Sequence, residues 1–212
     1  AVVDDREGVK ELFEWCSNGG VADLVTEMTA DTGLVEPVVS FQGVDGDITV
    51  DAAIAWTVEG RDTSIGFAHG VATPEGGTHI NGFRTAVTES VQKYIGDRNM
   101  LKDKEAAPNT RDIFAAALMV ASIMLPGPQF AGNSKSKLMN TEATSRTRAI
   151  VAPAMSRWLE EHPESAKKIG ELAIASMRSR TKSNAEQAAV RALLGKGNKS
   201  RNGLPAKLRD CT

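Results

Sequence analysis

Cysteine, histidine and aromatic residues are scarce in this chain of 212 residues, and long apolar runs are absent. Its two cysteines, Cys16 and Cys211, stand at opposite ends and form no CxxC pair, which argues against a zinc knuckle or a redox dithiol. The three histidines lack the spacing to cysteine or carboxylate that a metal site needs, so we expect no metal. No segment approaches the roughly 18 consecutive apolar residues that a membrane-spanning helix needs. The sequence also lacks a secretory signal peptide, which would have a basic segment followed by an apolar one. We therefore expect a cytoplasmic chain with reduced thiols and no membrane partner.

Signatures of common catalytic sites are absent as well. The sequence contains no GxxxxGK[ST] phosphate loop, no GxGxxG, no HExxH and no GxSxG. We expect no catalytic residue within this chain. The chain begins at Ala1 rather than at a methionine and ends just after a loop-like Gly-Leu-Pro, so we expect it to be a segment of a longer protein.

Charge is distributed unevenly along the chain, although the net charge is only −2. Residues 1–75 carry three basic and fifteen acidic side chains, residues 76–164 carry eleven and nine, and residues 165–212 carry eleven and three. A basic C-terminal third is typical of proteins that approach nucleic acid or another anionic surface. A solvated helix face rich in lysine and arginine explains it equally well.

Strand patterns occupy the first third of the chain and recur once near its middle. Short alternating segments bounded by turn residues predict an antiparallel meander of three strands, at 38–42, 48–58 and 63–68. The continuous apolar run 116–125 has the length of a buried strand and ends at Pro-Gly-Pro. A helix is the alternative for this run because Ala115–Ala117 favour helix.

Helical periodicity alternates with these strands and then dominates the C-terminal third. Helices are predicted at 21–28, 78–95, 111–115, 141–161 and 163–194. Thr110 is expected to cap the third of these helices, and Pro153 to kink the fourth. Pro163 suits the first turn of the last helix. Residues 195–203 are predicted to form a flexible linker, and the whole pattern is α+β.

Two glycine-containing segments are more specific than the composition: Pro-Glu-Gly-Gly-Thr-His-Ile-Asn-Gly-Phe-Arg at 74–84 and Pro-Gln-Phe-Ala-Gly-Asn-Ser-Lys-Ser-Lys-Leu at 128–138. In the first, the glycine pair allows a sharp turn before a helix. His79 in that helix is more often a structural histidine than a catalyst. In the second, Lys135 lies on a polar loop after an apolar strand, where a lysine can reach a phosphate as a point charge. A solvated lysine is the alternative.

These segments, followed by Gly203–Cys211, resemble in order and spacing the transducer region of the ATPase subunit of type IIA DNA topoisomerases, gyrase B and the ParE subunit of topoisomerase IV. The resemblance implies a transducer fold like ribosomal protein S5 domain 2, with a left-handed βαβ unit, a four-stranded sheet backed by helices and a long C-terminal helical arm. Residues 1–140 would form this core. Residues 141–212 would form helices and a linker toward a TOPRIM domain.

The resemblance also implies roles for individual residues. Lys135 matches a family lysine that contacts the γ-phosphate of ATP bound in a neighbouring domain, and Asn133 stands where the family has a glutamine. Arg84 matches an arginine that lines the DNA cavity of the dimer, although a surface arginine is an equal alternative. The shared structural motif consists of Gly76, Gly77, Thr78 and His79.

The function implied by this resemblance is signal transmission. ATP and Mg²⁺ would be bound mainly by a neighbouring ATPase domain of the GHKL class, and the full-length subunit would be an ATP-hydrolysing type IIA topoisomerase (EC 5.6.2.2). The chain alone would be inactive. Its partners would be DNA, a gyrase A or ParC-type subunit and a second copy of the ATPase subunit. A stand-alone nucleic-acid-binding module of S5-like fold is the alternative, which explains the basic tail but not the Lys135 loop. A small-molecule kinase of this fold would need a Gly- and Ser-rich phosphate loop, which is absent.

Overall fold

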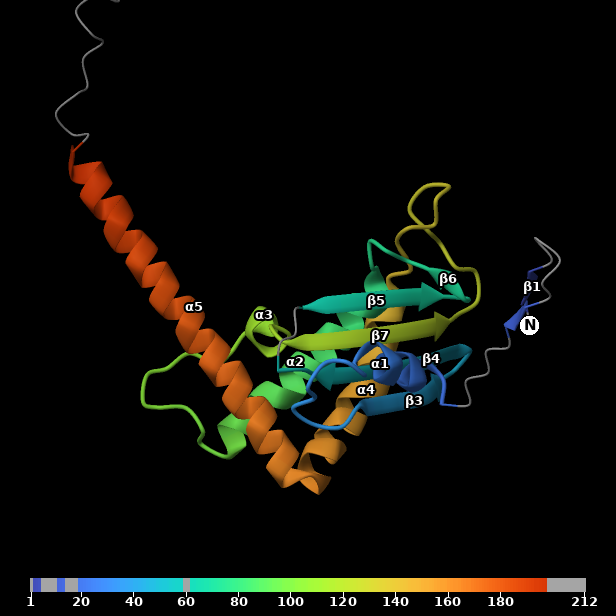
Figure 1. Ribbon diagram of the computed structural model, residues 1–212, viewed down its shortest axis with the longest axis horizontal. Helices are drawn as coiled ribbons and strands as arrows, with labels where there is room; N and C mark the ends of the chain where they lie inside the picture. The colour runs from blue at the N-terminus through green and yellow to red at the C-terminus, as the bar shows by residue number, and fades with distance from the viewer. Residues whose placement is uncertain (1, 5–10, 14–18, 59–61, 198–212) are drawn as a thin grey trace, which may run out of the picture.

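A mixed β-sheet with helices on both faces forms the centre of the computed structural model, which describes residues 2–4, 11–13, 19–58 and 62–197 (Figure 1). The strands of this sheet are β3 (Val39–Asp45), β4 (Ile48–Trp56), β5 (Thr63–Ala68), β6 (Val71–Ala72) and β7 (Ala117–Met124). Their order across the sheet is β3-β4-β7-β5-β6. A separate antiparallel pair is formed by β1 (Val2–Asp4) and β2 (Glu11–Phe13).

Strand β7 lies between β4 and β5, so the predicted meander of three consecutive strands is wrong. It pairs antiparallel with β4, where Met124 faces Thr49, and parallel with β5, where Leu118 faces Thr63. The physical reason is its composition, because a strand that is apolar on both faces is most stable in the middle of a sheet. The prediction of a strand rather than a helix for this apolar run is confirmed.

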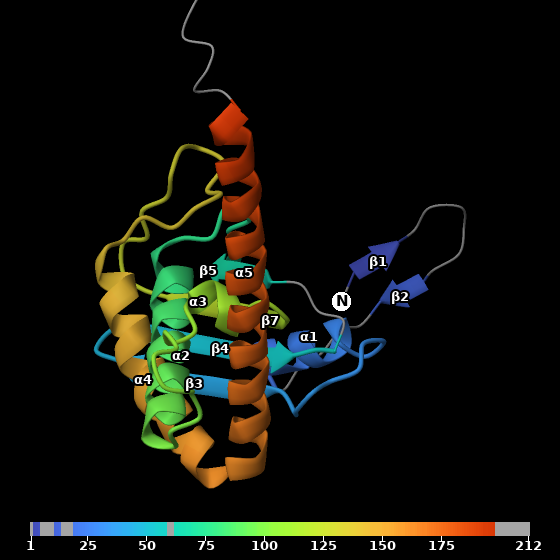
Figure 2. The same ribbon diagram turned by 90° about the vertical axis from the view of Figure 1, so that its left-hand side faces the viewer.

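Two long helices, α2 (Thr78–Asp97) and α4 (Glu142–Glu161), cover one face of the sheet, and the short helix α1 (Val21–Met28) covers the other (Figure 2). On the α2 and α4 face, alternate strand residues join one large core, in which the rings of Phe41 and Phe83 meet edge to face at 5.7 Å. On the α1 face, Val25 packs against Ala53 and Val120. These three helices confirm the helical periodicity, and α4 continues through Pro153.

The short helix α3 (Thr110–Ile113) begins after Asn109, so the predicted Thr110 cap is wrong. The Asn109 side chain accepts a hydrogen bond from the Asp112 backbone N–H, and the Asp112 carboxylate accepts one from the Asn109 N–H, which together form a capping box. Thr110 instead accepts a hydrogen bond from the hydroxyl of Thr88 on α2. The capping box thus stabilises the first turn of α3, and the hydrogen bond of Thr110 connects α3 to α2.

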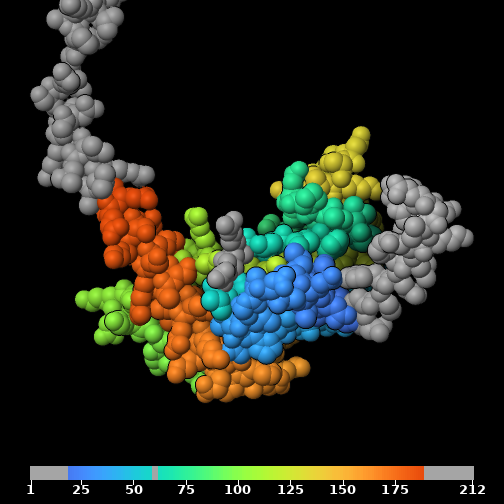
Figure 3. Space-filling view, in the orientation of Figure 1, coloured from blue at the N-terminus to red at the C-terminus, as the bar shows by residue number. Residues whose placement is uncertain are grey.

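Helix α5 (Pro163–Gly197) has 35 residues, a length of about 52 Å at 1.5 Å per residue. Its buried side chains extend from Ala166 to Met177, whereas residues 181–188 are exposed on every side. The end of the helix therefore projects from the sheet and its covering helices (Figures 1 and 3). It includes Gly195–Gly197, which we expected in a linker. The rest of that linker, the Gly203–Cys211 motif and both cysteines lie outside the described residues.

The fold is therefore α+β with a mixed sheet of five strands, where four were expected, because the two-residue β6 pairs with β5 at the edge. The connection from β5 through α2 to β7 joins two neighbouring parallel strands. Helix α4 packs against α2, and its residues Val151, Met155 and Leu159 share the large core with the sheet. In the described ranges, no helix combines the length and the apolar character needed to cross a bilayer.

Two glycines of α2 should respond oppositely to alanine. A Cβ on Gly82 would lie 2.4 Å from the backbone oxygen of Thr144 on α4, so Gly82→Ala should separate the helices and cost about 1–3 kcal/mol. A Cβ on Gly96 would meet nothing within 4 Å, so Gly96→Ala should stabilise the protein by about 0.5–1 kcal/mol. Urea unfolding of both variants measures the two changes. A neutral Gly82→Ala would contradict the close approach of α2 and α4.

Candidate functional site

The segment between β7 and α4, called here the 125–140 loop, folds back on itself beyond the end of the sheet (Figure 1). Its two sides are joined by backbone hydrogen bonds from Met139 N to Gln129 O, 2.8 Å, and from Ala131 N to Lys137 O, 2.9 Å. At the tip, Lys135 has a φ of 54°, a conformation uncommon for residues other than glycine. The loop is thus a closed hairpin-like projection with Lys135 at its turn.

The returning side of this loop pairs with the glycine pair that precedes α2. Thr78 N donates to Leu138 O at 3.1 Å, and Leu138 N donates to Gly76 O at 3.3 Å. Gly77 has a φ of 146°, and a Cβ there would lie 2.7 Å from both the backbone N and O of Leu138. Only glycine fits such a contact. The two segments that carried the resemblance, 74–84 and 128–138, therefore meet along one seam.

The tip of the loop presents polar groups to solvent. Asn133, Ser134 and Lys135 are exposed, whereas Lys137 is half-buried. The Lys135 Nζ lies 5.8 Å from the centre of the Phe130 ring. Within the part of the chain that the structure describes, no carboxylate forms an ion pair with Lys135. An exposed ammonium with no acidic partner is available to an incoming anion.

The base of the loop is fixed by Asn140, which the sequence analysis did not single out. Asn140 is buried, with only 5% of its surface exposed. The Oδ1 accepts a hydrogen bond from Gln129 N at 2.7 Å, and the Nδ2 donates to Gly127 O at 3.3 Å and to the Glu142 carboxylate at 2.8 Å. One amide thus joins both sides of the loop to the start of α4. The available signal was an asparagine directly before a predicted helix start, a position that favours asparagine side chains bonded to backbone.

A second anchor at the same base is His69, in the turn after β5. Its Nε2 lies within hydrogen-bond distance of both the backbone oxygen of Leu125, 2.5 Å, and the backbone nitrogen, 3.0 Å, and the His69 backbone N–H donates to Ile123 O at 2.9 Å. The end of β7 and the first residue of the loop are therefore held by β5. This contact joins residues 56 positions apart, and no local pattern indicated it.

His79 lies under the seam and is 1% exposed. Neither ring nitrogen has a hydrogen-bond partner, and the same is true of the buried hydroxyl of Thr73. Burial lowers the pKa of His79 from 6.5 to about 4, so the ring is neutral at physiological pH. A histidine closed off from solvent in this way packs the core beneath the glycine pair.

Arg84 of α2 is half-buried, and its side chain is held in place by several contacts. Its guanidinium makes two hydrogen bonds of 2.7 Å to the Asp62 carboxylate and one of 2.8 Å to the Ser64 hydroxyl, and it lies 4.2 Å from the centre of the Phe114 ring. Its side chain is 20% exposed. The charge of Arg84 is therefore largely matched by Asp62.

Over the described ranges, no group of three or more histidine, cysteine, aspartate or glutamate side chains is placed so that it could hold a metal ion.

Comparison with known proteins identifies the family. The sequence profile of the DNA gyrase B family matches residues 20–189, so the chain belongs to this family. DNA gyrase B of Streptococcus pneumoniae is 31% identical over 213 residues, covering all of this chain and 32% of that protein. DNA gyrase B of Mycobacterium tuberculosis is 34% identical over 194 residues, covering 91% of this chain and 28% of that protein. The chain thus spans about a third of the length of these relatives.

Solved structures agree in fold. The 43K ATPase domain of Thermus thermophilus gyrase B, determined in complex with an aminocoumarin, has a TM-score of 0.77 at 26% identity and covers 88% of this chain and 50% of that chain. The topoisomerase IV ATP-binding domain of Francisella tularensis has a TM-score of 0.66 at 26% identity, with coverages of 81% and 46%. The structural similarity therefore covers about half of each of those two chains.

Burial of His79 predicts a loss of stability in acid. The unfolded chain binds a proton at this residue below about pH 6.5, whereas the folded protein binds it only near pH 4, so the stabilising contribution is complete above pH 6.5 and is lost toward pH 4. Between pH 7 and pH 5 this loss is about 2 kcal/mol. Urea unfolding should show that His79→Gln removes this part of the pH dependence. His162→Gln, at an exposed histidine, is the control, and equal pH profiles for wild type and His79→Gln would contradict the prediction.

Loss of Asn140 should loosen the loop. Asn140→Ala leaves the Gln129 N–H and the Gly127 carbonyl without their partner, which should cost about 1–3 kcal/mol. Hydrogen exchange of the Gln129 amide should accelerate. Asn133→Ala, at an exposed asparagine of the same loop, should change stability by less than about 0.5 kcal/mol. Unchanged exchange at Gln129 in Asn140→Ala would show that the loop closes without this anchor.

Proposed function

We propose that this chain is the transducer part of the ATPase subunit of a type IIA topoisomerase, which couples ATP binding and hydrolysis in a neighbouring GHKL domain to DNA strand passage. The supporting observation is the seam between the Gly76–Gly77 pair and the 125–140 loop, in a chain of the DNA gyrase B family. The seam presents Lys135 at an exposed turn and connects it by backbone contacts to the start of α2. On this proposal the β5–α2–β7 unit has the left-handed S5-like connection. Residues 1–140 would be the S5-like unit, and residues 141–212, whose helices α4 and α5 pack in the same core, would lead toward a TOPRIM domain.

The residues of the loop fit contact with a nucleotide phosphate. Lys135 is exposed, positively charged and free of an acidic partner among the described residues, and Asn133 lies exposed two residues before it. We assign Lys135 as the ammonium that meets the γ-phosphate and Asn133 as a second donor. When bound, ATP supplies the free energy of hydrolysis for the cycle. The described residues offer no cluster for Mg²⁺, so its ligands are assigned to the neighbouring domain.

The loop would respond to the nucleotide through differential contacts. An attraction between Lys135 and the phosphate favours the arrangement in which the tip reaches the neighbouring domain, and loss of that phosphate removes the attraction. Because Leu138 is bonded to the backbone on both sides of Gly77, displacement of the tip acts on the first turn of α2. This is a switch of the hinge type, in which a small contact biases two rigid parts.

The partners we propose are DNA, a gyrase A or ParC-type subunit, and a second copy of the ATPase subunit, in the cytoplasm. Arg84 is proposed to line the DNA cavity of that dimer. Its pairing with Asp62 means that its contribution to attracting DNA is partly offset, so it would act as a fixed donor to a phosphate more than as a source of net positive charge.

A stand-alone nucleic-acid-binding module is the less favoured function. It relies on the basic C-terminal third, but ion pairs within the protein already engage three cations of α5: Lys168 with Glu36, Arg178 with Glu105, and Arg180 with Asp112. A surface whose lysine and arginine side chains are already paired with carboxylates attracts phosphates weakly. The alternative also leaves the seam and the exposed Lys135 without a role.

Replacement of Lys135 tests the proposal. In the full-length subunit, Lys135→Ala should lower the rate of ATP hydrolysis about 100-fold or more, because a donor to the developing charge is lost. Its stability should change by less than about 0.5 kcal/mol, since the side chain is exposed. Steady-state ATPase rates and thermal melts measure the two effects.

Lys137→Ala is the matched control, because Lys137 lies two residues further along the same loop and is half-buried. It should hydrolyse ATP much faster than Lys135→Ala. Wild-type hydrolysis by Lys135→Ala, or greater damage from Lys137→Ala, would overturn the assignment of Lys135.

A further inference from the structure

Helix α5 makes polar contacts at its start and, about three turns further on, at Arg178 and Arg180, and between them its buried side chains pack in the large core. At its start, Tyr94 on α2 donates to the Pro163 carbonyl, 3.3 Å, and Glu36 accepts from Ser165 and Lys168. Further along, Arg180 binds Asp112 of α3. Beyond this pair, residues 181–188 are exposed on all sides. Arg180 therefore makes the last ion pair to the core among the described residues, and beyond it Ser183, Asn184 and Gln187 line an open cavity that faces Asp62 and Arg111.

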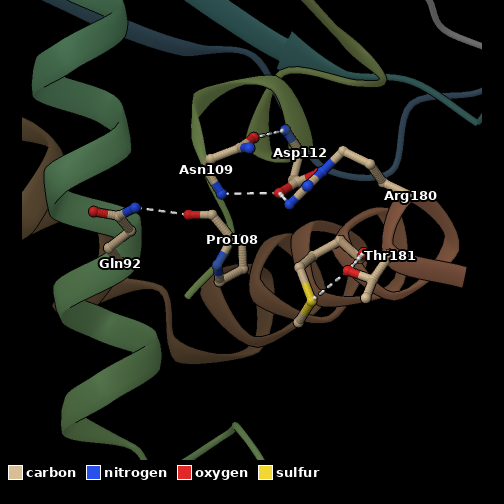
Figure 4. A network of polar contacts seen from close by, with 7 residues as sticks. Gln92, Pro108, Asn109, Asp112, Arg180 and Thr181 are labelled. Carbon is tan, nitrogen blue, oxygen red and sulfur yellow. Dashed lines mark hydrogen bonds and ion pairs between the residues drawn. The ribbon is translucent and has the colours of Figure 1, made fainter. Parts of the chain in front are cut away.

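The Arg180–Asp112 pair has the geometry of a rigid contact (Figure 4). Arg180 Nε donates to one carboxylate oxygen at 2.7 Å and an Nη donates to the other at 2.8 Å, a bidentate arrangement. The Asp112 side chain is 1% exposed, and it also accepts from the Asn109 N–H in the capping box. Burial alone raises the pKa of Asp112, but the hydrogen bonds from Arg180 and Asn109 outweigh it and the pKa lies below its ordinary value. The carboxylate is thus ionised and fixed in direction.

Helix α2 fixes the position of α3 and its Asp112. Gln92 Nε2 donates to the Pro108 carbonyl at 2.7 Å, just before the cap, and the Thr88 hydroxyl donates to that of Thr110 at 3.1 Å (Figure 4 draws the Gln92 contact). The same helix begins at Thr78, against the 125–140 loop. One continuous helix of 20 residues therefore joins the seam to the support of Asp112.

A second bidentate pair on α5, Arg178 with Glu105, differs in its support. Glu105 lies in the segment 98–109 that links α2 to α3, outside any helix or strand, and the two side chains are 44% and 24% exposed. A partner on such a segment can follow the helix when it moves. Asp112 cannot follow the helix in this way unless the capping box and the hydrogen bonds of Pro108 and Thr110 to α2 are broken.

We propose that the Arg180–Asp112 pair is the positioning contact that sets the direction of the projecting end of α5 relative to the α2–α3 unit. The inference rests on the proposed function, in which the end of α5 transmits the motion of the core toward a TOPRIM domain. The helix continues from residue 181 to Gly197, about 25 Å, so a rotation of about 10° at Arg180 displaces its end by about 4 Å. Arg180 and Asp112 are positioning residues and contact no substrate.

The first experiment measures the direction of the helix in the 212-residue chain. Spin labels are placed on Asp47→Cys, in the turn between β3 and β4, and on Glu186→Cys of α5, with Cys16 and Cys211 replaced by serine. Both label sites are exposed. Pulsed dipolar spectroscopy should give one narrow distance distribution for wild type. Arg180→Gln should broaden it, and Arg180→Lys, which keeps the charge but not the fork, should broaden it less.

Arg178→Gln is the matched control, because it removes the other bidentate pair, two residues closer to the start of the helix. It should leave the distribution narrow. An unchanged distribution in Arg180→Gln, or equal broadening in Arg178→Gln, would overturn the inference whatever the function of the chain. Circular dichroism melts of each variant confirm that the fold is retained.

The second experiment uses the full-length subunit with its partner subunit and DNA. Arg180→Gln should keep the ATPase rate near wild type while the topology change per ATP falls about 2- to 30-fold, the range for substitutions at coupling contacts. A broadened distribution with unchanged coupling would contradict the part of the proposed function that passes through α5. Failure of Lys135→Ala to affect hydrolysis, with the broadening intact, would instead overturn the nucleotide contact alone.

Discussion

The approach of the Gly77 backbone to Leu138 is the contact on which the other features depend. It brings together two segments 61 positions apart, with no room for a side chain between them. Backbone hydrogen bonds join the start of α2 to the return of the 125–140 loop, and the Thr144 hydroxyl of α4 donates to the Thr78 carbonyl beside them. Buried His79 beneath and Asn140 beside it fill and close the same region. A loop so supported can be long and polar and still have a defined tip.

The uneven charge of the chain has a structural explanation. Acidic residues of the first third pair with basic residues of the later parts: Glu36 with Lys168, Asp45 with Arg146, and Asp62 with Arg84. Glu36 shows the effect on ionisation, since hydrogen bonds from Lys168 and Ser165 lower its pKa despite burial. Most such exposed pairs contribute little stability individually. On α5, Lys168, Arg178 and Arg180 are each paired with a carboxylate of an earlier part of the chain, so the segment totals overstate the positive charge that solvent meets there.

Local patterns predicted the elements of the fold well and their arrangement poorly. The helices at 78–95 and 163–194 could be predicted from periodicity, and the strand in 116–125 from the length of its apolar run and the Pro-Gly-Pro after it, because each signal depends on residues close in sequence. The place of β7 between β4 and β5 could not, because the choice of neighbour is made by pairing over 55 to 75 positions. The glycine pair and Lys135 could be selected as a site. Asn140 and the Arg180–Asp112 pair could not, since their partners are set by tertiary contacts.

The central position of β7 has a consequence for how the chain folds. β3 and β4 form one hairpin and β5 and β6 another, each from neighbouring residues. Neither hairpin pairs with the other, because β7 separates them. The five-stranded sheet is therefore continuous only once residues 117–124 pair with both hairpins. Insertion of a late central strand raises the contact order and slows folding, and until then each hairpin has an unpaired edge open to a second copy of the chain.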